Sequence, residues 1–141
     1  PDLWPSDLVG EATLTPVAIL RRQGEALGGR TSNFVYGEVE SRPVASGAGF
    51  EHTLVLIAPF LRFRFPLVNV SHGIALYPVQ VAETDLTKPT APGSRYWSES
   101  ASTEAELRAV LQKFFEQERV KTVIRSLILQ SNEPDSQSKA S

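Results

Sequence analysis

The chain has 141 residues, of which 41% are hydrophobic and 21% charged, with a formal net charge of −2. This length and composition predict one globular domain with its own hydrophobic core. The chain contains no cysteine, which excludes disulfides, thiolate zinc sites and thiol nucleophiles. A pI of about 5.7 argues against a general polyanion binder.

The chain opens with the segment PDLWPSDLV, which has neither a basic leader nor an apolar signal core. We interpret residues 1–13 as an N-terminal extension. The longest apolar run, Leu54 to Leu61, is interrupted by Pro59 and is too short to cross a bilayer. From these features and the lack of cysteine we expect a cytoplasmic protein without membrane contact.

The first predicted element is a helix within the segment LTPVAILRRQGEALGGR, residues 14–30. Thr15 is a suitable N-cap, Pro16 suits the first helical position, and Gly28 with Gly29 marks the end. The apolar residues of this segment form one stripe: Val17, Ile19, Leu20, Ala26 and Leu27. The segment therefore predicts an amphipathic helix.

Extended runs follow this helix. Residues 33–41 are rich in strand-forming side chains, and residues 50–65 form a long apolar run. Pro59 lies inside that run and cannot donate to a ladder, so we expect an edge, a bulge or a break there. A further strand is expected on either side of His72, the second covering Ile74 to Val81. The sequence thus predicts three to four antiparallel strands.

Residues 84–101 show no period and are predicted to be a long loop. A helix returns at Thr103, which forms a capping box with Glu106. Its apolar direction changes near residues 117–119, so it either breaks there or packs on two partners. The polar tail, residues 132–141, is predicted to be disordered. We expect an α+β domain over residues 14–131, with the C-terminal helix, long or split, packed on one face of the sheet.

The favoured function is a non-enzymatic protein-interaction module, either an accessory protein or one that oligomerises. Tyr96 and Trp97 are large aromatic residues within an otherwise polar loop, a pattern that suits an interface anchor or a plug over the sheet. The last helix has more apolar positions than one narrow stripe requires. Its predicted interface residues are Val120, Ile124, Leu127 and Ile128. The expected partner is another protein or a second copy of the chain.

An alternative function is anion or nucleic-acid binding. Arg62 and Arg64 alternate with phenylalanines in a run, His52 to Ala82, that contains no acidic residue, and Arg21 and Arg22 could extend the cationic ridge. The simpler interpretation is a half-buried strand whose arginines face water.

The helix–strands–helix order resembles that of the double-stranded RNA-binding module. That module needs cations at the start of its final helix. In this chain Glu104 and Glu106 occupy those positions. Nucleic acid is therefore the less favoured partner.

A third hypothesis is a small enzyme that uses His52 or His72, the only two histidines of the chain. Neither has the i, i+4 helical spacing of a zinc hydrolase, and no nucleophile elbow or phosphate-binding loop accompanies them. His52 is predicted on the exposed face of a strand and His72 in a tight turn. We therefore assign no catalytic residue and expect no cofactor and no metal.

Overall fold

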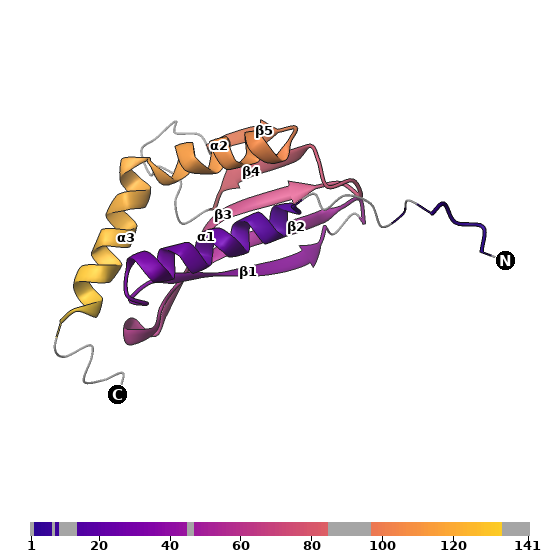
Figure 1. The fold of residues 1–141 in the computed structure, drawn as a ribbon. Coiled ribbons are helices and arrows are strands. Elements are labelled where there is room, and N and C mark those ends of the chain that lie inside the picture. The colour runs from indigo at the N-terminus through magenta and orange to yellow at the C-terminus, as the bar shows by residue number, and fades with distance from the viewer. Residues whose placement is uncertain (1, 7, 9–13, 45–46, 85–96, 134–141) are drawn as a thin grey trace.

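The computed structural model describes residues 2–6, 8, 14–44, 47–84 and 97–133 and shows an α+β fold (Figure 1). An N-terminal helix precedes a five-stranded antiparallel sheet, and two helices follow it. The elements are α1 (Pro16–Arg30), β1 (Tyr36–Pro43), β2 (Phe50–Ala58), the short 3₁₀ helix η1 (Pro59–Leu61), β3 (Phe63–His72), β4 (Val79–Glu83), β5 (Ser98–Ala101), α2 (Glu104–Phe115) and α3 (Glu118–Ser131).

The sheet is a meander in which each strand pairs with its neighbour in sequence, in the order β1-β2-β3-β4-β5. Pro59 begins η1, which separates β2 from β3, so of the predicted edge, bulge or break the break is the one observed. Strand β3 continues through Pro66. There the pairing passes from Leu54–Val68 to Val55–Pro66 and leaves Leu67 as an extra residue in β3.

The sheet has five strands, so the predicted number of three to four was too low. The fifth, β5, lies inside the segment that the sequence assigned to a loop. Only Ala101 of its four residues is buried, so no apolar alternation reveals it. The strand expected over Ile74 to Val81 begins only at Val79, and Ile74 is 77% exposed.

Both predicted helix starts are confirmed by their caps. The Thr15 hydroxyl accepts a hydrogen bond from the Ala18 amide, and the Thr103 hydroxyl accepts one from the Glu106 amide. The C-terminal helix is split, because α2 ends at Phe115 and α3 begins at Glu118. Of the two alternatives that the sequence left open, the break is the one observed.

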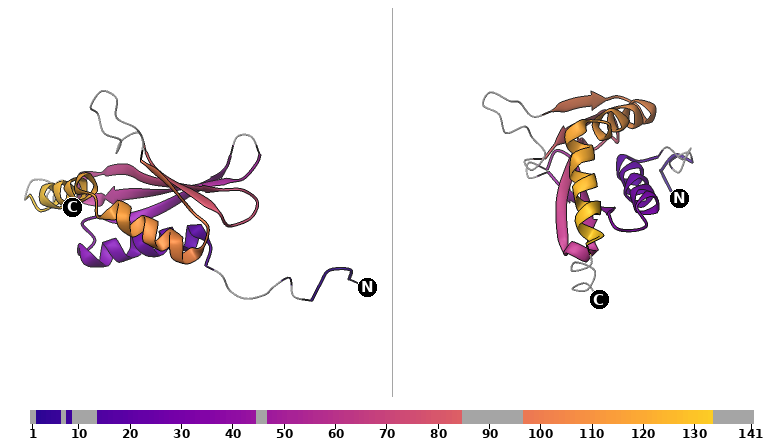
Figure 2. Two further views of the ribbon diagram at one scale, coloured as in Figure 1. Left: turned by 90° about the horizontal axis from the view of Figure 1, so that it is seen from above. Right: turned by 90° about the vertical axis from the view of Figure 1, so that its left-hand side faces the viewer.

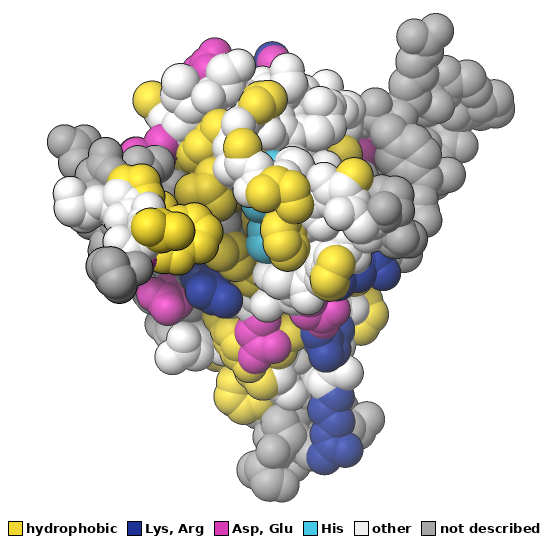
Figure 3. Space-filling view, turned by 90° about the vertical axis from the view of Figure 1, so that its right-hand side faces the viewer, with side chains coloured by type: hydrophobic (Ala, Val, Ile, Leu, Met, Phe, Trp, Pro, Cys, Tyr) yellow, Lys and Arg dark blue, Asp and Glu magenta, His cyan; other side chains and the backbone are white. Residues whose placement is uncertain are grey.

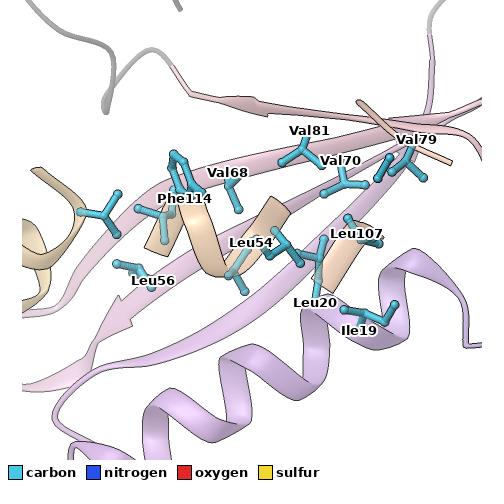
Figure 4. Close-up of a cluster of buried hydrophobic side chains, with 14 of the residues drawn as sticks. Ile19, Leu20, Leu54, Leu56, Val68, Val70, Val79, Val81, Leu107 and Phe114 are labelled. Carbon is cyan, nitrogen blue, oxygen red and sulfur yellow. The ribbon is translucent and has the colours of Figure 1, made fainter. Parts of the chain in front are cut away.

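The helices α1 and α2 lie on one face of the sheet, and α3 runs across the sheet's end near η1 (Figures 1 and 2). The core lies between these layers (Figure 4) and is built from aliphatic residues of α1, β2, β3 and β4 together with α2. Its members include Ile19, Leu20, Leu54, Leu56, Val68, Val70, Val79, Val81, Leu107, Leu111 and Phe114. The other face of the sheet is polar, with the Asn69 amide donating to Glu51 and Thr53.

Helix α1 rests directly on β1 through two glycines. A Cβ added at Gly24 would lie 2.4 Å from the carbonyl oxygen of Gly37, and one at Gly37 would lie 2.7 Å from the Cα of Gly24. No side chain separates the two backbones at this point. The contact fixes the height of α1 above the sheet and so sets the geometry of the space beside it.

Candidate functional site

A groove of about 700 Å³ lies on the helix-covered side of the molecule, bounded by α1, α2 and α3. Its floor is formed by three leucines of the sheet, Leu54, Leu56 and Leu67. Its volume falls within the range of protein sites that bind ligands. The groove is therefore the best candidate for a binding site among the residues that the structure describes.

Each helix contributes apolar side chains to the walls of the groove. Ala26 and Leu27 come from α1, Leu111 and Phe115 from α2, and Ile124 from α3. Ala26 is small and exposed, so it leaves more room at the α1 wall than a leucine at this position would. The floor leucines are only 1–2% exposed, so the apolar surface open to an occupant is that of the partly buried wall residues Leu27, Phe115 and Ile124. These walls favour an apolar occupant.

The rim of the groove carries more positive than negative charge. Arg30, Arg108 and Lys121 line it, against a single acidic residue, Glu116. Arg108 also pairs with Glu104 at 3.2 Å, whereas Arg30 forms no ion pair with any described residue. The rim therefore favours an occupant with acidic groups beside its apolar surface.

Lys121 is held in place on the rim by its own helix. Its ammonium group lies 2.9 Å from Glu118 Oε1, three residues earlier in α3. The hydrogen bond from Lys121 and the charge of Lys121 lower the pKa of Glu118, with a smaller effect from Arg125. Both partners are exposed to solvent, so the pair orients the cation and adds little stability.

A buried ion pair fixes the start of α3, which forms one wall of the groove. Arg119 lies 2.5 Å from the fully buried carboxylate of Glu83 at the end of β4, although its N–H groups are not aligned with it as hydrogen bonds. The Trp97 amide donates to the other oxygen of Glu83 at 2.6 Å. Removing Arg119 would leave the buried Glu83 carboxylate without a counter-charge. The pair therefore fixes α3 relative to the sheet.

The structure separates the four predicted interface residues of the last helix. Val120 and Leu127 lie in the core of the chain, Leu127 being 5% exposed, so neither offers a free surface. Ile124 lines the groove, and Ile128 is partly buried against the core. The interface hypothesis stays a prediction, and within α3 it now rests on Ile124.

Of the two aromatic residues predicted as an interface anchor, Tyr96 lies outside the described residues and Trp97 is described. Trp97 is partly buried and its ring centroid lies 5.0 Å from that of Phe114 in α2. Trp97 therefore packs on the chain's own core, as the plug alternative expects.

The four predicted anion-binding arginines do not form one patch. Arg62 follows η1 with a left-handed φ of 51° and lies outside the strand, so the expected alternation begins only at Phe63. Arg64 is already paired with Glu40 from β1. Arg21 and Arg22 lie on α1, exposed. The positive charge expected from the acid-free run is thus partly neutralised by Glu40 of β1.

The two histidines lie side by side. His52 is 7% exposed and points to the helix-covered side of the sheet, so the expectation of an exposed face was wrong. It shares this face with Leu54 and Leu56 because they follow at two-residue intervals along β2. Its Nε2 lies 3.0 Å from Nε2 of His72, which ends β3.

The groove could not be identified from the sequence. Its residues come from three helices and two strands, and no local pattern joins them. The one available signal was the excess of apolar positions on the last helix, which pointed to Ile124. Among the described residues no group of three or more histidines and carboxylates is placed to hold a metal ion.

Comparison of the chain with known protein families, with curated proteins and with solved structures finds no match. No helix in the described part of the chain combines the length and the apolar character needed to span a bilayer.

Proposed function

We propose that this chain is a non-enzymatic protein-interaction module whose helical groove receives an apolar helical segment of a partner protein with acidic residues at its sides. The observation that carries the proposal is the combination of partly exposed apolar walls, Leu27, Phe115 and Ile124, with three cations and one carboxylate at the rim. A single amphipathic helix presents apolar side chains on one face and charges at its borders. Its shape and charge are complementary to the groove.

The described lining of the groove holds no hydroxyl or thiol nucleophile. Its charged residues are arginine, lysine and one glutamate, and neither histidine lines it. Binding by apolar burial, with charge selecting the partner, is what such a surface does well. A second copy of the chain and a cytoplasmic location stay predictions that this surface does not decide.

The test uses two short helical peptides with the same leucine stripe, one flanked by glutamates and the other by lysines. Fluorescence anisotropy measures their affinity for the chain. We expect the acidic peptide to bind about tenfold or more tightly than the basic one, because like charges at the rim repel the latter. Equal affinities, or no saturable binding of either peptide, would sink the proposal.

A matched pair of variants ties the result to the groove. Ala26 and Ala109 are both exposed alanines within helices, but only Ala26 lines the groove. Ala26→Glu should weaken binding of the acidic peptide by about tenfold or more, because the glutamate is larger than alanine and repels the peptide's glutamates. Ala109→Glu should leave the affinity unchanged. If the two variants behave alike, the peptide binds elsewhere.

A further inference from the structure

A second site lies away from the groove, at the end of the sheet where the histidines meet. His52 Nε2 and His72 Nε2 are 3.0 Å apart. Each ring has a further partner at Nδ1. The Ser41 hydroxyl is 2.7 Å from His52 Nδ1, and the carbonyl oxygens of Gly73 and Ala75 lie 2.7 and 3.1 Å from His72 Nδ1.

These partners determine where the ring hydrogens lie. A carbonyl oxygen only accepts, so His72 must carry its hydrogen on Nδ1, and Nε2 of the neutral ring has a free lone pair. The Ser41 hydroxyl can donate or accept. When it donates, His52 carries its hydrogen on Nε2 and donates to His72. When it accepts, His52 carries its hydrogen on Nδ1, and both Nε2 lone pairs face the space between the rings.

The second arrangement has the features of a histidine metal site. Histidines that bind metals almost always donate their other ring N–H to a carbonyl, carboxylate or similar group, which fixes the ring and its tautomer. Here both Nδ1 atoms have such partners, and both Nε2 atoms converge. We propose that His52 and His72 together bind one divalent first-row transition-metal ion, such as Zn²⁺ or Ni²⁺, through their Nε2 atoms.

The spacing requires only a small adjustment. Two nitrogens at about 2.0–2.1 Å from a tetrahedral zinc ion lie about 3.3 Å apart, a few tenths of an ångström more than the observed 3.0 Å. His72 is the last residue of β3 and is followed by Gly73. The ring at the end of the strand can therefore move by this amount without disturbing the ladder.

The remaining metal ligands would come from solvent or from another molecule. The described residues supply no third histidine or carboxylate at this point. Figure 3 shows histidine atoms between hydrophobic side chains, although His52 itself is only 7% exposed. The exposed apolar residues near His72 in sequence or pairing are Phe50, Ile74 and Leu76. With two protein ligands, the bound ion stays exchangeable. The charge of Arg21, which acts on His52, opposes the ion and limits the affinity.

The test is calorimetric titration of the untagged chain with ZnCl₂, NiCl₂ and MgCl₂, alongside NMR of the imidazole nitrogens. The chain has only two histidines and no cysteine, so every imidazole signal belongs to this pair. We expect one Zn²⁺ or Ni²⁺ per chain, with both Nε2 signals shifted, and no response to Mg²⁺, which prefers oxygen ligands. No shift of the imidazole signals at millimolar Zn²⁺ would overturn the proposal.

Three variants locate the ion, with circular dichroism confirming that each is folded. His72 is half-exposed, so His72→Gln should fold and should lose at least about tenfold in affinity. Ser41→Ala removes the hydrogen-bond partner of His52 Nδ1 and should weaken metal binding by about 10–100-fold. Ser71→Ala, on the opposite face of β3, is the control and should change nothing. Unchanged affinity in His72→Gln would contradict the site, and unchanged affinity in Ser41→Ala would contradict the assigned partner of His52 Nδ1.

Discussion

Helix α1 has two very different sides. Toward β1 its backbone touches the strand, because Gly24 and Gly37 leave no room for a side chain between them. Toward α2 it borders a groove of about 700 Å³ floored by leucines. The two sides differ because one faces Gly37 of β1 and the other faces the groove beside α2.

This difference shows how the fold holds a groove open. The glycine contact fixes α1 on the side that faces β1, which we call its closed side. Helix α1 is therefore not free to slide toward α2 and fill the space. On the other side α3 is fixed by the Arg119–Glu83 ion pair and by Leu127 in the core. The groove is therefore a consequence of two rigid attachments. The following predictions test those attachments, from the largest expected effect to the smallest.

The attachment of α3 should be the most sensitive. Leu127→Ala removes a core side chain and should lower the free energy of unfolding by about 2–5 kcal/mol. Leu129, two residues further along the same helix, is 68% exposed, and Leu129→Ala should change stability by less than about 0.5 kcal/mol. Urea unfolding of both variants measures the difference. Similar values for the two would show that α3 is not anchored in the core.

The closed side of α1 should tolerate no added methyl group. Gly24→Ala would bring a Cβ against the backbone of Gly37 and should destabilise the fold by about 1–3 kcal/mol, although alanine favours helix. Gly29 lies in the same helix, with nothing within 4 Å of an added Cβ. Gly29→Ala should stabilise by about 0.4–1 kcal/mol. Thermal melting of the two variants should thus shift in opposite directions, and stabilisation by Gly24→Ala would refute the contact.

Protonation of His52 should lower the free energy of unfolding. His52 lies on β2 and contacts Ser41 of β1, the strand against which α1 packs. Burial lowers the pKa of His52 from 6.5, and the charges of His72 and Arg21 lower it further. The unfolded chain then binds a proton more readily than the native one. The stability that the neutral His52 contributes is present above about pH 6.5 and is lost as the pH falls through the pKa of His52 in the folded chain.

Urea unfolding in chelator-containing buffer at about pH 7.5 and pH 5.5 measures this effect, because most carboxylates stay ionised over that range. We expect lower stability at the lower pH. In His72→Gln one cause of the lowered pKa of His52 is gone, so the loss should be smaller. A chain that becomes more stable as the pH falls would contradict the burial of a neutral His52.

The sequence predicted the helices well because their signals are local. The signals of Thr15, Pro16 and the Thr103–Glu106 capping box each act within one turn. The change in apolar direction near residue 117 marked the place of the split but left a continuous helix on two partners as the alternative. The α+β class followed from the order of such segments. Strand β5 was missed because its one buried residue, Ala101, gives no alternating pattern.

The histidine pair and the groove depend on contacts that no local pattern records. Strand β2 is apolar at both odd and even positions around Leu54, Val55 and Leu56, so the sequence could not show which face of the sheet His52 takes. Its approach to His72 depends on the register between β2 and β3. The groove likewise depends on how far α2 lies from α1, which is decided by how the two helices pack on the same face of the sheet.

The most direct test of the groove as a binding surface is an NMR titration of the isotope-labelled chain with the acidic helical peptide. The backbone amides that shift should cluster on α1 around Ala26 and Arg30, on α2 around Leu111 and Phe115, and on α3 near Ile124, and they should saturate together. Amides of the polar sheet face and of the His52–His72 end should stay in place. Shifts confined to either of those surfaces, or no saturable shift at all, would contradict the proposed function.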